Sequence, residues 1–275
     1  MNWLTEPFAY EFMQQAMLIS ALIAAAAGAL SCFLVLKGWS LMGDAIAHAV
    51  LPGIVLAYMT GLPLILGAFA AGMFCAGAVG FLTENSRVKP DTVMGVVFAG
   101  MFGLGVVLYT WIQPGVHLDH ILFGDVLGVT WGDIIQTGVI SGAALTVLLT
   151  RRKDFLALAF DPQHARAVGL PAKWLEIALL AVIAMVVVGA LKAAGLILAI
   201  ALLIAPGAIA YLITKRFEHM LFASIFLAVF SAVAGVWASF WLGSAPAPTI
   251  VVVLTALFIA AFLFAPRQGI LMQRV

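Results

Sequence analysis

Two ionisable residues stand four positions apart in the stretch GDAIAHAVLPG, residues 43–53, which otherwise holds small and apolar residues. In a helix, Asp44 and His48 lie on one face, about 6 Å apart along the axis. A carboxylate and an imidazole nitrogen form half of a site for a borderline divalent ion such as Mn²⁺, Fe²⁺ or Zn²⁺. We therefore predict that this pair lines a metal path. The alternative is a hydrogen bond between the two side chains that fixes how the helix packs.

A second group of potential metal ligands occurs in the stretch HLDHILFGD, residues 117–125. His117, Asp119 and His120 are candidates for an outer metal contact, with Asp125 close behind them in the sequence. Loops of this composition are more often simply solvated. Trp111 and Trp131 flank the region and are typical of residues at a membrane surface.

The composition restricts the kind of protein in which these residues can act. The chain has 275 residues, of which 65% are hydrophobic and 9% charged, whereas about a quarter of the residues in a soluble domain are charged. The chain is therefore predicted to be an integral membrane protein. A net charge of +1 and the absence of a basic cluster argue against a nucleic-acid partner.

The sequence also lacks the motifs of an enzyme. It contains no G-x-x-x-x-G-K-[ST] phosphate loop, no G-x-S-x-G, no H-E-x-x-H and no C-x-x-C. Cys32 and Cys75 both lie in apolar runs, so neither indicates a disulfide or a metal framework. We predict that the chain is not an enzyme and holds no permanent cofactor. If transport is driven by ATP, a separate chain must supply the ATPase.

The hydrophobic pattern predicts an all-α membrane helix bundle, because a spanning helix needs about 20 mostly apolar residues. Nine candidate spans satisfy this rule, or eight if one of them is re-entrant, and the whole chain, 1–275, is predicted to be a single domain. Residues 113–131 are interpreted as a loop or a short re-entrant segment. The predicted spans are 14–36, 40–58, 62–82, 92–112, 132–150, 175–191, 193–213, 220–242 and 248–265.

The basic residues predict how the bundle is oriented. If the N-terminus is outside and the C-terminus inside, the segments between spans place every Lys and Arg except Lys192 on the cytoplasmic side. Such a bias is typical of membrane proteins. In the sixth and seventh spans, Gly189, Gly195, Pro206 and Gly207 are compatible either with a kinked transport path or with close helix packing.

The longest inner segment, residues 151–176, is the part most suited to bind a cytoplasmic protein. We predict a short helix in it, with Asp161 as the N-cap and Pro162 as the first helical residue, ending near Gly169. Ala165 and Gly169 are four positions apart and so share one face, where another protein could approach closely. A solvated connector is the other interpretation of this segment.

Three stretches carry a resemblance to a known family. These are LKGWSLMGDAIAHAVLPGIVLAY, AFDPQHARAVGLP and GLILAIALLIAPGAIAYLITKRF. They resemble the metal-ion permeases of ABC transporters, which serve zinc, manganese and chelated iron. The resemblance covers about residues 15–265 and is strongest to the manganese/iron branch.

The resemblance implies a partner set and residue roles. Two permease chains, identical or paralogous, form the pore in a bacterial inner or plasma membrane. Two cytoplasmic ATPase subunits dock beneath, and an extracytoplasmic metal-binding protein delivers the ion. Asp44 and His48 match the residues thought to line the ion path, which works by alternating access. Residues 155–172 match the coupling segment that contacts the ATPase, with its helix at Asp161–Gly169.

Three rival interpretations remain open at the level of sequence. An ion-coupled secondary transporter would use Asp44 and His48 as a relay without any ATPase, although no internal repeat favours it. An ABC permease for a siderophore or another chelate would share the bundle, but a large ligand does not need this pair. A purely structural membrane subunit predicts no effect from changing either residue.

Overall fold

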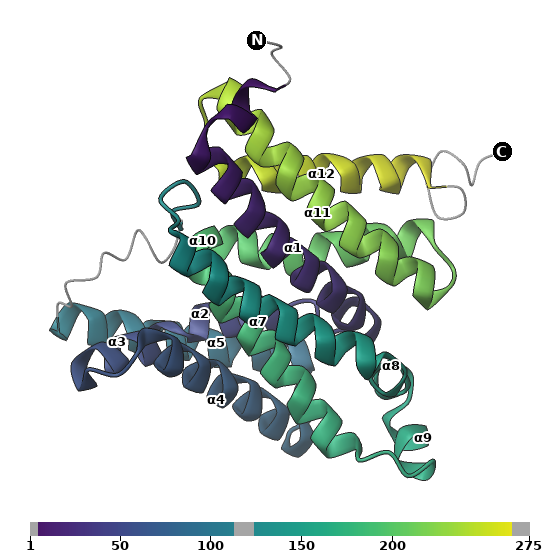
Figure 1. Cartoon of the computed structure of the whole chain (residues 1–275). Helices are drawn as coiled ribbons and strands as arrows, with labels where there is room; N and C mark the ends of the chain where they lie inside the picture. Colours follow the sequence, from purple (N-terminus) through teal and green to yellow (C-terminus); the bar gives the residue numbers. More distant parts are fainter. Residues whose placement is uncertain (1–4, 113–123, 266–275) are drawn as a thin grey trace.

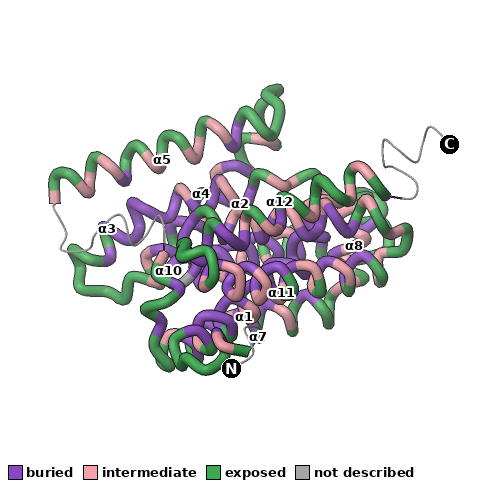
Figure 2. Tube along the Cα trace, turned by 90° about the horizontal axis from the view of Figure 1, so that it is seen from above, coloured by how far each residue is buried: buried purple, intermediate pink, exposed green. Residues whose placement is uncertain are grey.

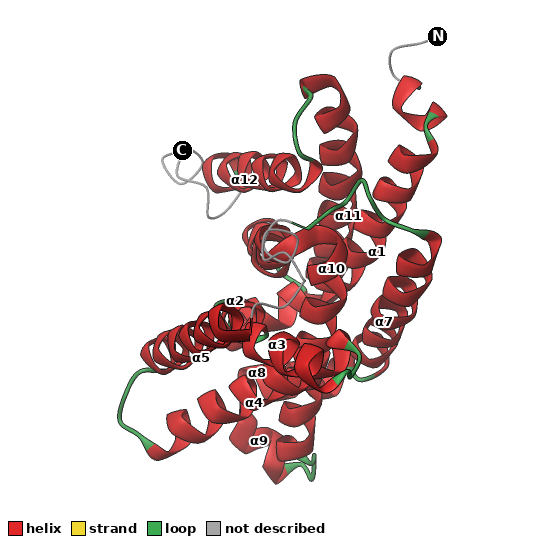
Figure 3. Ribbon diagram, turned by 90° about the vertical axis from the view of Figure 1, so that its left-hand side faces the viewer, coloured by secondary structure: helices red, strands yellow, loops and turns green. Residues whose placement is uncertain are grey.

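The computed structural model describes residues 5–112 and 124–265, and in these ranges the regular structure is entirely helical (Figures 1 and 3). The predicted all-α class is therefore confirmed. The helices are η1 (Glu6–Ala9), α1 (Glu11–Lys37), α2 (Met42–Ala49), α3 (Leu51–Thr60), α4 (Leu64–Asn85), α5 (Pro90–Ile112), α7 (Trp131–Thr150), α8 (Arg152–Phe160), α9 (Pro162–Ala167), α10 (Ala172–Ile213), α11 (Phe217–Leu242) and α12 (Pro246–Phe264).

Nine stretches in the described part of the chain are long and apolar enough to cross a membrane, as predicted. The second span consists of α2 and α3, which meet at Val50. The sixth and seventh spans are the two halves of α10. The boundary between these two spans lies between Leu191 and Ala194, as predicted. The backbone departs from helical angles close by, at Gly195, whose φ of 71° is in the left-handed region. Glycine tolerates that conformation because it has no Cβ atom.

Helix α1 forms the centre of the bundle. It is buried along most of its length and packs against α7, α10 and α11. The approach to α11 is close at Gly28, where a Cβ atom would come within 2.8 Å of the Cβ atom of Ala228. The Ser224 hydroxyl donates a hydrogen bond of 2.6 Å to the Gly28 carbonyl across the same contact. Small residues in α1 therefore let its neighbours surround it tightly.

Helix α5 lies at the opposite extreme, at the edge of the molecule. Figure 2 shows it apart from the main body, with exposed and half-buried residues alternating along it and few buried ones. It is joined to the bundle mainly through α2, α3 and α4. At this contact a Cβ atom on Gly105 would lie 2.9 Å from the side chains of Leu51 and Pro52. The second span is thus held against α5 while the rest of α5 stays uncovered.

The second span is also pressed against α4. A Cβ atom on Gly53 would collide with the carbonyl of Gly67, and one on Gly67 would collide with the carbonyl of Gly53. The two helices can come this close only because both positions are glycine. In α2, a Cβ atom on Gly43 would lie 2.7 Å from the side chain of Leu203 in α10. The helix that bears Asp44 and His48 is therefore fixed by α4, α5 and α10.

Proline and serine shape the second half of α10. Pro206 has no backbone N–H, so the regular hydrogen-bond ladder is interrupted there. The hydroxyl of Ser31 in α1 accepts a hydrogen bond of 2.9 Å from the Gly207 N–H and donates one of 3.1 Å to the Ile204 carbonyl. Ser31 therefore pairs buried backbone groups at the point where the helix is weakest.

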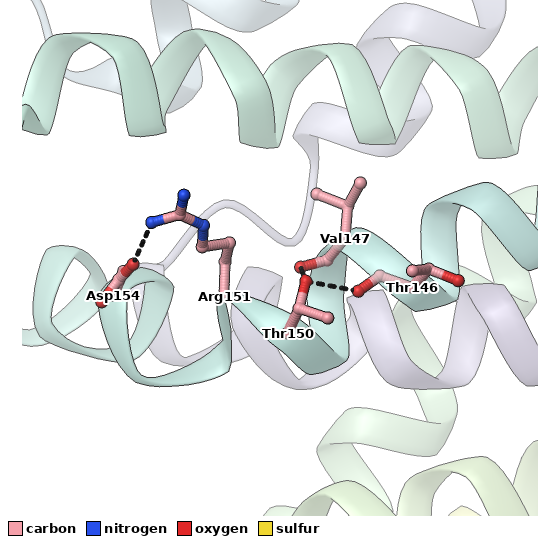
Figure 4. Close-up of polar contacts among 5 residues, drawn as sticks. All are labelled: Thr146, Val147, Thr150, Arg151 and Asp154. Atoms are coloured by element: carbon pink, nitrogen blue, oxygen red, sulfur yellow. Dashed lines mark hydrogen bonds and ion pairs between the residues drawn. The ribbon is translucent and has the colours of Figure 1, made fainter.

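One end of the bundle carries the inner segment. Helix α7 ends at Thr150, whose hydroxyl donates to the carbonyls of Thr146 (2.6 Å) and Val147 (3.2 Å), and α8 begins beside an ion pair of 3.1 Å between Arg151 and Asp154 (Figure 4). Helices α8 and α9 continue beyond this end of the bundle (Figure 1).

Two longer-range ion pairs hold the same end together. Arg152 in α8 lies 2.8 Å from Glu218 in the first turn of α11. Lys37, the last residue of α1, lies 3.0 Å from Glu176 near the start of α10. Basic residues predicted to face the cytoplasm therefore gather at one end of the molecule.

Candidate functional site

Asp44 and His48 contact each other directly. The Nδ1 atom of His48 is 3.0 Å from the Oδ1 atom of Asp44 and 3.1 Å from the Asp44 backbone carbonyl. A proton on Nδ1 satisfies both contacts and leaves the lone pair of Nε2 for another partner. A carboxylate that fixes the tautomer and direction of a histidine in this way is common beside metal ions. The predicted shared helix face is confirmed.

The pair is neither sealed in the core nor fully solvated. The side chains of His48 and Asp44 are 26% and 27% exposed, while Ala45 and Ala49 beside them are buried. The imidazole ring contacts both Phe98 and Phe102 of α5, with ring centroids 5.4 and 5.5 Å away. These two aromatic rings, together with the bond to Asp44, determine where the imidazole can point.

The chain supplies only part of a coordination sphere. No group of three or more His, Cys, Asp or Glu side chains that could hold one metal ion occurs in residues 5–112 and 124–265. Zinc is usually bound by four ligands, and manganese prefers six. One copy of this pair can therefore hold a divalent ion only weakly, unless a second chain or another molecule adds ligands.

The predicted helix of the inner segment is α9, and its start is as expected. Asp161 is the N-cap, and its Oδ1 atom accepts hydrogen bonds from the N–H groups of His164 (3.0 Å) and Gln163 (2.9 Å). These two bonds lower the pKa of the Asp161 carboxyl from its ordinary value. Pro162 is the first helical residue, and Gly169 follows the helix with a φ of 82°.

The face that α9 offers to a partner differs from the predicted one. Ala165 is completely buried and packs into its own chain, because the turn after α9 folds back and Leu170 donates a 3.0 Å hydrogen bond to the Ala165 carbonyl. The exposed side chains of α9 are Pro162, Gln163, His164, Arg166 and Ala167, and Gly169 beyond it is also exposed. A protein that approaches α9 from outside would meet these residues and not Ala165.

Comparison with known proteins assigns the chain to a family. The model of the ABC 3 transport family matches residues 9–265. The chain belongs to the ABC 3 transport family. Among its curated relatives, the chelated iron transport system membrane protein YfeD of Yersinia pestis is 51% identical over 95% of this chain and 88% of its own length. The manganese transport system membrane protein MntB of Synechocystis sp. is 47% identical, over 99% and 89% respectively.

A solved structure also matches this ABC 3 family chain. PsaBC from Streptococcus pneumoniae in complex with Fab has a TM-score of 0.88 and 32% sequence identity, and the match covers 100% of this chain and 99% of that one. The predicted family and the membrane helix bundle are confirmed by these comparisons.

The outer cluster of this family member is only partly visible. His117, Asp119 and His120 lie outside the described residues, so their role as an outer metal contact stays a prediction. Asp125 closes a turn, since its Oδ1 atom accepts a 2.9 Å hydrogen bond from the Gly128 N–H. It lines a cavity of about 220 Å³ together with Asp133, which forms a capping box with Thr130 at the start of α7.

Sequence reasoning missed several residues that position the pair. Phe98 and Phe102 are spaced like a helix face, and that spacing could have indicated a shared contact, but nothing in the sequence said that the contact is His48. The ion pair between Lys37 and Glu176 joins residues far apart in the chain. Ser31 stands in an apolar run, where a hydroxyl needs a partner; the sequence did not reveal that the partner is the backbone of α10.

Proposed function

We propose that the chain is the membrane permease subunit of an ATP-driven ABC importer for divalent metal ions. Its substrates are manganese or iron, and zinc is a further candidate because a carboxylate and an imidazole also bind zinc. The observation that carries the proposal is the Asp44–His48 pair, held in a span that is fixed on three sides. Relatives named for manganese and for chelated iron transport support the choice of metal. The chain itself performs no chemistry on ATP, which a separate ATPase subunit hydrolyses.

The pair suits transient binding of a cation in the membrane. A bare divalent ion in a bundle of low dielectric constant needs compensating negative charge. Asp44 supplies one negative charge per chain, so two copies of the chain across a shared path neutralise a charge of +2. His48 adds a nitrogen ligand through Nε2 while its Nδ1 stays bonded to Asp44. Because Nδ1 and Nε2 lie on opposite sides of the imidazole ring, Asp44 contributes its charge and the orientation of His48 rather than a second ligand to the same ion. A single nitrogen ligand per chain gives a site that can also release its ion.

The importer requires partners that this chain does not provide. A second permease chain, identical or paralogous, completes the path. An extracytoplasmic metal-binding protein releases the ion into the outer mouth, and His117, Asp119 and His120 are its candidate first contacts. Two ATPase subunits bind the cytoplasmic end, where residues 155–172 form the coupling segment. Alternating access then moves the ion past Asp44 and His48.

The proposed membrane is the bacterial inner or plasma membrane, with the N-terminus outside. Lys37 and Arg152 form ion pairs at the end of the bundle that carries α8 and α9, and the cytoplasmic side of a membrane protein is the one rich in Lys and Arg. This orientation places the coupling segment where an ATPase can reach it.

The test is uptake of radiolabelled Mn²⁺ by proteoliposomes that contain the chain with its ATPase and its metal-binding protein. We expect uptake that requires ATP and is reduced by unlabelled Fe²⁺ or Zn²⁺ in an order that ranks the metals. Uptake driven by a proton or sodium gradient without the ATPase would instead establish a secondary transporter. Uptake of a metal chelate without competition by the free ions would establish a chelate permease.

A further inference from the structure

We propose that Lys37 is a positioning residue that links the coupling segment to the helix bearing the Asp44–His48 pair. The inference deepens the proposed function and rests on it. The Lys37–Glu176 ion pair is the contact through which movement of α9 is passed to the metal path. Three observations carry it: the double contact of Lys37, the short hydrogen-bonded turn between α9 and α10, and the short distance along the chain from Lys37 to α2.

Lys37 contacts both the start of α10 and the turn that precedes α2. Its Nζ atom lies 3.0 Å from Glu176 Oε1 and 3.9 Å from the centroid of the Trp39 ring. The Lys37 side chain is only 9% exposed, whereas Glu176 is 33% exposed. A nearly buried ammonium group that loses its carboxylate partner is left without compensation, so the ion pair is strongly preferred over separation. The cation–π contact adds attraction to Trp39.

On one side of Lys37, the connection runs to the ATPase end. Helix α9 is tied to its following turn by hydrogen bonds from the N–H groups of Gly169 to Arg166 (3.1 Å) and Leu170 to Ala165 (3.0 Å). The turn leads directly into α10, in which Ala172 and Leu175 are buried. Glu176 stands one turn into that helix. Only residues 168–171 separate α9 from α10, and their hydrogen bonds connect the two helices, so a displacement of α9 is passed on to Glu176.

On the other side, the connection runs to the metal pair. Gly38 ends α1 with a φ of 71°, and the Trp39 N–H bonds back to the Leu34 carbonyl at 2.8 Å. The Trp39 carbonyl accepts a 2.9 Å hydrogen bond from the N–H of Met42, the first residue of α2. Trp39 and Met42 line the same cavity of about 330 Å³ as Glu176. Asp44 lies in the first turn of this helix. A displacement of Lys37 and Trp39 therefore shifts Asp44 through only a short stretch of chain.

Loss of the Lys37–Glu176 ion pair should impair the coupling of ATP hydrolysis to transport without removing either binding site. Loss of the ion pair leaves α9 free to bind the ATPase and leaves the Asp44–His48 pair in place, since neither contains Lys37. What is lost is the transmission between them. ATP hydrolysis is then expected to continue while fewer metal ions move per ATP.

The experiment measures the number of ATP molecules hydrolysed per Mn²⁺ imported, in proteoliposomes with the complete transporter. Lys37→Met removes the charge and keeps much of the length, Glu176→Gln removes the charge of the partner, and Lys37→Arg keeps both contacts. Arg151→Met is the matched control, because Arg151 forms an ion pair at the same end of the molecule but is 67% exposed. Variants are compared at equal amounts of assembled complex.

We expect the ratio of ATP to Mn²⁺ to rise about tenfold in Lys37→Met and in Glu176→Gln, a size usual for coupling between two sites. Lys37→Arg and Arg151→Met are expected to keep the wild-type ratio. An unchanged ratio in Glu176→Gln would overturn the inference, as would a failure of Lys37→Arg to keep it. If Lys37→Met does not assemble, Glu176→Gln decides the question. A wild-type complex without ATP-dependent uptake would refute the proposed function itself.

Discussion

The close crossing of α3 and α4 allows one substitution to be predicted in magnitude. In Gly67→Ala, the new Cβ atom would lie 2.5 Å from the Cβ atom of Ala57 and would also collide with the Gly53 carbonyl. The first distance is about 1 Å shorter than an optimal carbon–carbon contact. Gly77→Ala is the matched control, because Gly77 lies in the same helix and a Cβ atom there meets no other atom within 4 Å.

The difference between these two variants isolates the cost of overpacking. Both gain about 0.8–1.0 kcal/mol of helix propensity when glycine becomes alanine. Only Gly67→Ala must also separate two helices, and overpacking of this kind costs about 1–3 kcal/mol. We therefore expect Gly67→Ala to be less stable than Gly77→Ala by about 1–3 kcal/mol. For a chain of this size the difference corresponds to a separation of the two melting temperatures of roughly 2–12 °C.

Thermal unfolding of the detergent-solubilised protein, followed by tryptophan fluorescence, measures this difference. Transport is expected to fall in Gly67→Ala as well, because the widened crossing shifts α3 and with it the helix that carries His48. Gly77→Ala should transport normally. Equal melting temperatures for the two variants would refute the reasoning, since they would mean that the glycines do not limit how closely α3 and α4 approach.

Three further predictions concern other parts of the molecule. Ser31→Ala leaves the buried Gly207 N–H without its partner, so thermal unfolding should show a loss of about 1–3 kcal/mol, and a stability equal to wild type would contradict this. The pKa of Asp161 is lowered in the folded protein, so its capping contribution is fully present above the unfolded-state pKa and is lost as the pH falls through the folded-state pKa. Binding of the ATPase to α9 should therefore be insensitive to pH near neutrality and weaken only in acid. A loss of binding already near pH 7 would exclude this cause. Arg152→Met should change stability by less than about 1 kcal/mol, because its ion pair with Glu218 is more than a third exposed, and a larger drop in a denaturation assay would show that the pair is more than a surface contact.

Much of the fold could be predicted because membrane spans depend on length and apolar composition. Those two properties are visible in the sequence, and all nine predicted spans appear among the described residues. The boundary between the sixth and seventh spans could also be predicted, because hydropathy detects the charge of Lys192. The non-helical backbone at Gly195, where φ is left-handed, could not be predicted, because hydropathy carries no information about backbone angles.

The candidate site could be predicted only where its parts are local in sequence. The spacing of Asp44 and His48 was sufficient to put them on one helix face, and the N-cap role of Asp161 followed from the residue that comes after it, Pro162. Contacts between distant segments could not be predicted, because no pattern in a single sequence records them. The partner of Lys37 in α10 is one example, and the inward direction of Ala165 is another.

The central claim is that Asp44 and His48 bind the transported ion, and Asp44→Asn tests it most directly. Asparagine has nearly the same shape and its side-chain oxygen can still accept the hydrogen bond from His48 Nδ1, so helix packing is kept while the negative charge is lost. The measurement is the initial rate of ATP-dependent Mn²⁺ uptake in proteoliposomes at equal amounts of complex, with Glu84→Gln as a control for the loss of an exposed carboxylate. We predict that Asp44→Asn abolishes uptake while the complex still assembles and hydrolyses ATP. Uptake at the wild-type rate would contradict the account, because the pair would then serve only to pack the helix.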